Sequence, residues 1–506
     1  MLWELRAAWN GWNCIKQEGE SSRKMASPWT FTLLCGLLAA TLVQATLSPS
    51  AVLSLSSEVV KDGLTQELKD HDAISILQQL PLLRAVQEEE ANSRSALGDV
   101  LTSILKQITW LKVTSANVLQ VQVQPSANGQ ELIVKIPVDM VAGFNTPLVK
   151  TIVEIQMEAE AQALIRVETD EQGHSRLVLS DCSNSHGRLR ISLLHKLSIL
   201  VNSLADKVIS LLVPALPKLV KSQLCPLIET TFEEMGADLL RLVRAPVPLG
   251  SGQLVFDLLS PDIKDGVIQL NLGAKLLDSQ GEVTNEFSNS AASLMVPALD
   301  GTPFSLVVRQ DVVNAAVGTL LPPEELVVLL YSVLPELAQQ LKSSIRAIRE
   351  EAANQLGPTQ IVKILTQETP ELLLDQGSAT VAQLIVLQVF ATSEASRPIF
   401  TLGIEASSEA QFYTNGDQLM LNLNEISSDR IHLLTSSIGL FNTELLKDII
   451  TEILDSILLP NENGKLRSGV LLSIVKALGY EAAATSVTED AIVITPAAPD
   501  HFLLSR

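Results

Sequence analysis

The sequence predicts an α+β protein of two similar domains, in each of which a long twisted antiparallel sheet wraps a long helix. Three observations lead to this fold class. The chain of 506 residues is too long for one ordinary core. Strict apolar–polar alternation marks strands with one buried face, whereas apolar residues at every third or fourth position mark helices. Helix, strands and helix follow one another twice in the same order, which indicates an internal duplication.

The chain begins with the features of a secretory signal. An apolar run of about 13 residues, Phe31 to Val43, precedes residues that suit cleavage after Ala45. This run is too short to cross a bilayer comfortably, since a transmembrane helix needs about 20 apolar residues. We therefore expect an N-terminal extension at residues 1–24, a signal peptide at residues 25–45, and a secreted protein without a transmembrane anchor. A membrane anchor is the alternative for this run.

Removal of residues 1–45 leaves two cysteines, Cys182 and Cys225, in an oxidising compartment. Only one intramolecular disulfide is then possible. Closing a loop of this length stabilises a fold by about 4 kcal/mol in the chain-entropy model. Two free, buried thiols are the alternative.

The first half of the mature chain contains the clearest strand and the clearest long helix. A Leu-rich stretch, Leu64 to Leu83, is predicted to be helical. Asn128-Gly129 is a good hairpin turn between two strand-like runs. Residues 153–163 alternate strictly, with Val153, Ile155 and Met157 at the start of the apolar face, and this pattern belongs to an antiparallel sheet. An amphipathic helix follows from Leu197, and we expect Pro214 and Pro217 to interrupt or kink it before a second helical stretch with Cys225.

The second half repeats this plan after a Pro-rich junction at residues 245–250. We expect short strands at 254–259 and 267–277, a helical stretch at 324–356, strands at 381–390, 400–407 and 419–423, and a helix at about 443–458. The predicted domains are therefore an N-terminal domain at residues 46–243, a linker or central-sheet region at 244–285, and a C-terminal domain at 286–506.

Charge and motifs exclude several function classes. The net charge of −21 repels polyanions, so nucleic-acid binding is not expected. None of the six histidines lies in a metal-binding spacing, and the sequence has no nucleophile elbow, P-loop or dinucleotide fingerprint. We expect no enzyme activity, no metal and no cofactor. Arg188, Arg190 and Lys196 are either a local phosphate-binding patch or a solvated strand face.

Several segments resemble the PLUNC branch of the bactericidal/permeability-increasing (BPI) family. They are WTFTLLCGLLAATLVQATLSP (29–49), ELIVKIPVDMVAGFNTPLVKTIVEI (131–155), RLVLSDCSNSHGRLRISLLHKLS (176–198), LVPALPKLVKSQLCPLIE (212–229), LGIEASSEAQFYTNGDQLMLNLNEISSDRI (402–431) and NGKLRSGV (463–470). The resemblance implies two BPI-type barrels joined by a central sheet into an elongated boomerang, with an apolar lipid pocket in each barrel. It also implies a disulfide between Cys182 and Cys225.

The resemblance further implies secretion onto airway, nasal and oral epithelia and a role in innate immunity, including binding of lipopolysaccharide. Residues 46–243 carry 17 Lys and Arg against 23 Asp and Glu, so capture of acyl chains is favoured over capture of lipid A phosphates or membrane lysis. Val153, Ile155 and Met157 are candidate lipid contacts, with a plain core role as the alternative. We expect lipids, from lipopolysaccharide to phospholipid acyl chains, as partners. The alternative function is that of a structural or surface-active mucosal-fluid protein that acts through protein partners.

Overall fold

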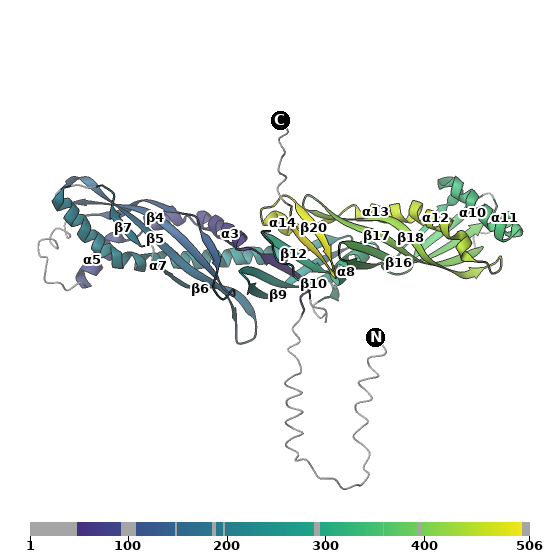
Figure 1. The fold of residues 1–506 in the computed structure, drawn as a ribbon, viewed down its shortest axis with the longest axis horizontal. Coiled ribbons are helices and arrows are strands. Elements are labelled where there is room, and N and C mark those ends of the chain that lie inside the picture. Colours follow the sequence, from purple (N-terminus) through teal and green to yellow (C-terminus); the bar gives the residue numbers. More distant parts are fainter. Residues whose placement is uncertain are drawn as a thin grey trace, which may run out of the picture. The chain divides into compact units, whose positions relative to one another are not determined.

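The computed structural model describes residues 48–92, 108–146, 149–184, 189–195, 198–287, 294–357, 359–391 and 397–497 (Figure 1). The predicted extension and signal peptide lie outside these residues. The described chain forms three antiparallel sheets with helices packed against them, so the α+β class is confirmed.

The first sheet belongs to the N-terminal half and has the strand order β2-β4-β5-β6, with β3 paired to β4 and β7 paired to β5. Its longest strand, β5, contains the predicted alternating segment, and Val153, Ile155 and Met157 are all 0% exposed. The predicted turn at Asn128-Gly129 joins β3 to β4, with Gly129 at a φ of +70° that suits glycine. The strands are β2 (Leu111–Val118), β3 (Gln122–Pro125), β4 (Leu132–Thr146), β5 (Val149–Thr169), β6 (Ser175–Asn184) and β7 (Arg190–Leu193).

Helix α7 (Ile199–Val243) packs against β5, β6 and β7 and is one continuous helix of 45 residues. The expected interruption at Pro214 and Pro217 is wrong. Each proline removes one backbone hydrogen bond, but Ala215, Leu216 and Val220 are buried around them, and this packing outweighs the local cost. Residues Val201–Val243 are also long and apolar enough to cross a membrane by length and composition alone, and 44% of the most apolar window is buried. A core helix has the same composition.

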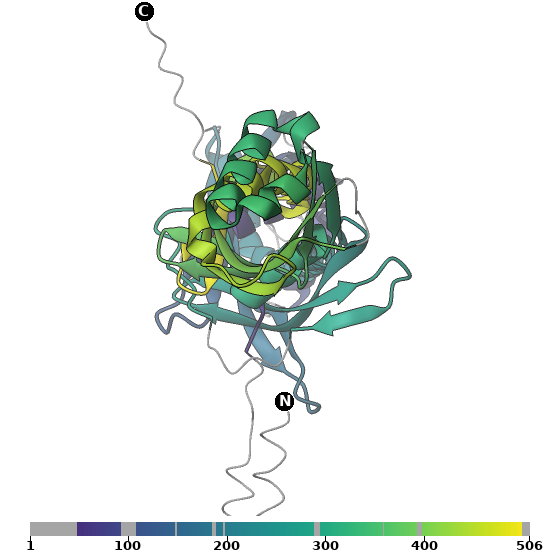
Figure 2. The same cartoon turned by 90° about the vertical axis from the view of Figure 1, so that its right-hand side faces the viewer.

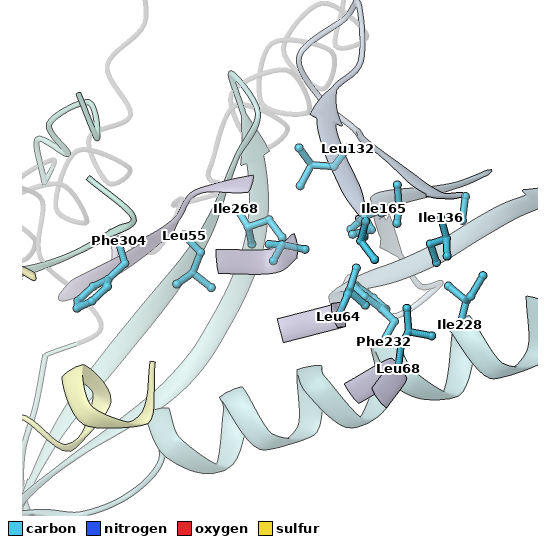
Figure 3. Close-up of a cluster of buried hydrophobic side chains, with 14 of the residues drawn as sticks. Leu55, Leu64, Leu68, Leu132, Ile136, Ile165, Ile228, Phe232, Ile268 and Phe304 are labelled. Atoms are coloured by element: carbon cyan, nitrogen blue, oxygen red, sulfur yellow. The ribbon is translucent and has the colours of Figure 1, made fainter. Parts of the chain in front are cut away.

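The predicted helical stretch from Leu64 to Leu83 is divided among three helices, α3 (Ser57–Asp70), α4 (Ala73–Gln78) and α5 (Leu82–Asn92). The first break falls at Asp72, which has a φ of +49° and accepts a hydrogen bond from Ser75. In Figure 3 the core of this half lies between α3, α7 and the strands, with Leu64, Leu68, Ile228, Phe232, Leu132, Ile136 and Ile165 pointing toward one another.

The second sheet draws strands from distant parts of the chain, in the order β20-β21-β12-β1-β10-β9-β8, with β11 paired to β10. Its first strand in the sequence, β1, pairs on one side with β10 and on the other with β12. The strands are β1 (Ala51–Leu55), β8 (Val247–Leu249), β9 (Gly252–Lys264), β10 (Val267–Leu277), β11 (Val283–Glu286), β12 (Phe304–Arg309), β20 (Ala483–Thr488) and β21 (Ala491–Pro496). We call this the central sheet.

The third sheet belongs to the C-terminal half and has the order β13-β14-β16-β17-β18-β19, with β15 paired to β16. Figure 2 shows its curved strands beneath the green helices α10 (Pro335–Ile348) and α11 (Glu350–Leu356). The strands are β13 (Glu325–Leu329), β14 (Gln360–Thr366), β15 (Glu371–Asp375), β16 (Ser378–Ala391), β17 (Phe400–Asn415), β18 (Gln418–Ser436) and β19 (Val470–Leu471).

The helices of the C-terminal half differ from the expectation in two places. The predicted helix at 324–356 is wrong for Glu325–Leu329, which forms β13 on the edge of the sheet, because its β-branched, alternating residues pair with β14. The helix expected at about 443–458 continues to Leu466 and contains a π-helical turn. The helices are α8 (Gln310–Leu320), α9 (Leu330–Val333), α10 (Pro335–Ile348), α11 (Glu350–Leu356), η3 (Thr443–Leu446), α12 (Lys447–Ile453), η4 (Leu454–Leu458), α13 (Leu459–Leu466) and α14 (Ser473–Ala477).

Candidate functional site

An apolar cavity lies where the end of α7, the central sheet, α8 and the segment from α13 to α14 meet. It encloses about 1080 Å³ of space not filled by atoms, its mouth included. About 120 Å³ of this space admits the centre of a water molecule, well above the roughly 10–15 Å³ that one water requires. The lining residues are Leu242, Val243, Ala245, Val247, Leu249, Leu254, Phe256, Leu272, Leu306, Val308, Val312, Val313, Ala316, Val317, Leu320, Phe412, Leu419, Met420, Leu421, Leu466, Gly469, Val470, Leu471, Leu472, Ser473, Ile474, Ile492 and Ile494.

Two periodicities in the sequence place these side chains in the wall. On the central sheet, residues two apart face the cavity, as Leu306 and Val308 do on β12, because successive strand residues point to opposite faces. On α8 the stripe Val312, Ala316 and Leu320 repeats every four residues, so it lies along one face of the helix.

The wall of this cavity consists almost entirely of hydrocarbon side chains. Among the described residues that line it, Ser473 is the only one with a polar side chain. An ionised group placed here would lose its hydration without gaining a partner, which is costly. A flexible apolar chain, by contrast, would leave water at no electrostatic cost. The cavity can therefore accommodate acyl chains, and the Ser473 hydroxyl is the one polar side-chain group in its wall.

Helix α13, whose Leu466 forms part of the wall, is fixed to the third sheet by polar contacts. Asn463 accepts a hydrogen bond from the backbone N–H of Leu423 at 2.8 Å and donates one to the carbonyl of the same residue at 2.7 Å. The Lys465 ammonium lies 2.6 Å from a carboxylate oxygen of Glu324. The two Asn463 hydrogen bonds cover the edge of β18 with a helix.

Glu462 is the buried titratable group of this helix, with only 3% of its surface exposed. Gln383 on β16 donates a hydrogen bond to its carboxylate at 3.0 Å. Burial raises the pKa of Glu462 to about 7; the Gln383 hydrogen bond opposes this rise, nearby Glu324 adds to it, and Lys465 opposes it. The carboxyl group is therefore close to half protonated at neutral pH.

A second, more polar cavity adjoins the first. It encloses about 710 Å³ of space, its mouth included, and is lined by Tyr413, Leu421, Asn422, Leu459, Pro460, Asn463 and Arg467. Leu421 lines both cavities.

The sequence-predicted residues lie elsewhere. Cys182 on β6 and Cys225 on α7 form a disulfide with a Cα–Cα distance of 5.7 Å, so the helix is bonded covalently to the sheet. Val153, Ile155 and Met157 belong to the core of the N-terminal half and line neither of the two cavities described above. A lipid contact at these three residues stays a prediction. Of the candidate phosphate patch, Arg190 is exposed on β7, whereas Arg188 and Lys196 lie outside the described residues.

One group of side chains in the described chain has the donor set for a metal ion. The ligand atoms of Glu67, His71 and Glu234 lie within 4.8 Å of one another. However, His71 Nε2 is 2.5 Å from Glu234 Oε2. Two ligands of one ion lie roughly 3 Å or more apart, so this contact is a hydrogen-bonded pair that connects α3 to α7.

Sequence reasoning did not find the residues around the cavity. Leu, Val and Ile lining a hollow follow the same periodicity as residues that fill a core. The most local signal was the apolar segment Val470–Ile474 after Gly469, whose φ of +61° allows β19 to approach Met420 closely.

Curled antiparallel sheets packed on long helices, in two halves that share a central sheet, define a two-domain protein of the BPI type. Two domain models of the LBP / BPI / CETP family match the chain, the N-terminal domain at residues 67–235 and the C-terminal domain at residues 328–494. The chain therefore belongs to the LBP / BPI / CETP family, and the predicted family resemblance is confirmed.

Known relatives extend over nearly the whole chain. BPI fold-containing family B member 1 of Homo sapiens is 68% identical over 473 residues, which cover 94% of this chain and 98% of the relative. The protein of the same name from Mus musculus is 59% identical over 94% of this chain and 100% of its own length. A crystal structure of lipopolysaccharide binding protein aligns with a TM-score of 0.48 and 15% identity, over 89% of this chain and 98% of that chain.

Proposed function

We propose that this protein is a secreted, non-enzymatic lipid-binding protein of innate immunity at airway and oral epithelia. It takes the acyl chains of lipopolysaccharide or related amphiphiles into the apolar cavity and so modulates the host response. The observation that carries the proposal is the cavity wall itself, which is apolar except for Ser473. Each methylene group that leaves water contributes about 0.8 kcal/mol, so a chain of a dozen carbons gains roughly 10 kcal/mol before entropy costs.

The charge of the protein supports acyl chains as the recognised part. Residues 1–45 carry four basic and three acidic residues, so the proposed mature chain has a net charge of −21 − 1 = −22. Such a field disfavours long-range attraction of a polyanionic surface. Affinity then comes from burial of hydrocarbon, within the proposed N-terminal (46–243), central (244–285) and C-terminal (286–506) regions of the secreted chain.

Native mass spectrometry of the secreted protein tests this proposal. We expect co-purifying lipid, and we expect the delipidated protein to bind added lipid A and phospholipid. The variant Ala316→Phe places a ring in the cavity and should weaken lipid binding about tenfold or more, since it displaces at least two methylene groups. Ala315→Phe is the matched control, because Ala315 lies on the same helix and is similarly half-buried but does not line the cavity.

Two other outcomes would contradict the proposal. A protein that carries no lipid and ignores added lipid would favour a structural or surface-active role through protein partners. Release of fatty acid from added lipid would reveal an enzyme.

A further inference from the structure

We propose that the second cavity binds the anionic headgroup, a carboxylate or a phosphate, of the amphiphile whose hydrocarbon tail occupies the apolar cavity. This inference rests on the proposed function and adds the headgroup class to it. The two cavities would then be the two ends of one amphiphile site, with Arg467 as the charged group that selects the ligand.

The walls of the two cavities are built from neighbouring residues. On β17, the consecutive residues Phe412 and Tyr413 point to opposite faces of the strand, and they line the apolar and the polar cavity, respectively. At the end of α13, Leu466 lines the apolar cavity and the next residue, Arg467, lines the polar one. Leu421 of β18 contacts both spaces. A ligand with its tail in the apolar cavity would therefore reach the polar one around the edge of β18, past Leu421, which lines both.

The shared wall lies at a break in the cover of the β18 edge. Strand β19 pairs with β18 only at Gln418 and Leu419, and Asn463 of α13 covers the same strand at Leu423. Between these two points, at residues 420–422, none of the described strands pairs with this edge, while the opposite edge pairs with β17. The apolar and polar cavities meet at this uncovered part of the strand.

Charge and hydrogen bonding single out Arg467 as the group that is available to a ligand. The other cation of this helix, Lys465, is paired with Glu324. Arg467 is exposed and forms no ion pair with any of the described residues, and the Tyr413 hydroxyl makes no hydrogen bond to them. A planar guanidinium binds a carboxylate or phosphate through two parallel hydrogen bonds, and a phenol hydroxyl can donate a third.

The apolar cavity can hold the tail of an amphiphile but not its charged headgroup. Its wall offers one hydroxyl, that of Ser473, and no charge, so a headgroup inside it would stay unpaired. An amphiphile must keep its charged end outside the hydrocarbon region, and the guanidinium of Arg467 is the unpaired cation at the adjoining cavity.

Titration of the delipidated full-length protein with three probes of equal chain length tests the inference. The probes are palmitate, palmitoyl lysophosphatidate and uncharged hexadecanol. We expect Arg467→Gln to weaken binding of both anionic probes about threefold to tenfold and to leave hexadecanol binding unchanged. The salt dependence of palmitate binding should also fall, because a charge pair has been removed. Arg346→Gln is the matched control, since Arg346 is an exposed arginine of α10 that lines neither cavity.

The outcomes separate this inference from the proposed function. If Arg467→Gln changes none of the probes, or changes all three equally, the headgroup site is wrong, while hexadecanol binding that is sensitive to Ala316→Phe keeps the lipid-binding proposal. If the wild-type protein binds none of the three, both proposals fail. A loss for palmitate but not for the lysophosphatidate, or the reverse, supports the site and identifies which anion it prefers.

Discussion

The two halves of this protein fix a helix to a curved sheet by different means. In the N-terminal half, α7 is bonded to β6 through Cys182–Cys225 and packs on the buried apolar face of β5. The C-terminal half contains no cysteine. Its helix α13 is fixed by polar contacts, above all those of Glu462 with Gln383 and of Asn463 with Leu423.

This difference shows that one fold plan can be stabilised by a covalent bond in one half and by polar contacts in the other, one of which depends on the protonation of Glu462. The polar contacts of α13 lie beside the apolar cavity, whereas the disulfide lies within a core where Val153, Ile155 and Met157 are fully buried. Glu462, with its raised pKa, makes the stability of the C-terminal half depend on pH, and this half also contributes most of the cavity wall.

Of the changes considered, removal of the disulfide should have the largest effect, on the free energy of unfolding of the N-terminal half. We expect Cys182→Ala with Cys225→Ala to destabilise the N-terminal half by about 4 kcal/mol, since the unfolded chain regains the entropy of an open loop. In the proposed mature chain, residues 46–506, Trp110 is the only tryptophan, and all three tyrosines, Tyr331, Tyr413 and Tyr480, lie in the C-terminal half. Urea unfolding followed by tryptophan fluorescence should shift, while the tyrosine signal stays in place. Equal shifts of both signals would mean that the halves unfold as one unit.

The second prediction concerns Glu462. The folded-state pKa of about 7 lies above the ordinary value of 4.5, so the folded protein binds the proton more tightly. Its stabilising effect is complete below about pH 4.5 and is lost as the pH rises through 7. Glu462→Gln keeps the hydrogen bond to Gln383 and should remove a difference of about 3 kcal/mol in unfolding free energy between pH 4.5 and 8. Urea unfolding at several pH values measures it, with exposed Glu452→Gln as the control that should keep the wild-type dependence.

The smallest expected effect tests the continuity of α7. Pro214 is exposed and lies inside the helix. Pro214→Ala restores a backbone hydrogen bond and improves helix propensity, while the unfolded chain gains freedom. We expect the free energy of unfolding, measured from the tryptophan-monitored urea transition, to rise by about 1 kcal/mol. A loss of stability would show that the proline shapes the helix to fit its sheet.

Local sequence patterns predicted the parts of the fold that depend on which face of a strand is buried or on the residues of a turn. The alternation at residues 153–163 identified the buried face of β5, and Asn128-Gly129 identified a hairpin. The compartment and the cysteine count led to Cys182–Cys225. The strand and the hairpin are determined by residues within the segment itself, and the disulfide by the presence of only two cysteines.

Strands whose pairing partners are distant in the sequence could not be predicted from local patterns. Residues Ala51–Leu55 form β1 between β10 and β12, more than 200 positions away, and nothing in the five residues specifies these neighbours. Glu325–Leu329 falls within the helical stretch predicted at 324–356, yet pairing with β14 decides its structure. The cavity was harder still to predict, because it forms where side chains from distant segments leave space between them unfilled.

The last turn of α7 has a consequence for variation in this family. Leu242 and Val243 close part of a hollow that also includes Ile492 and Ile494, close to the other end of the described chain. Both halves of the chain therefore contribute to the wall of this hollow. A substitution at the end of the N-terminal half therefore alters a hollow whose wall is formed mainly by the C-terminal half, so the sequences of the two halves are not independent of each other at this junction.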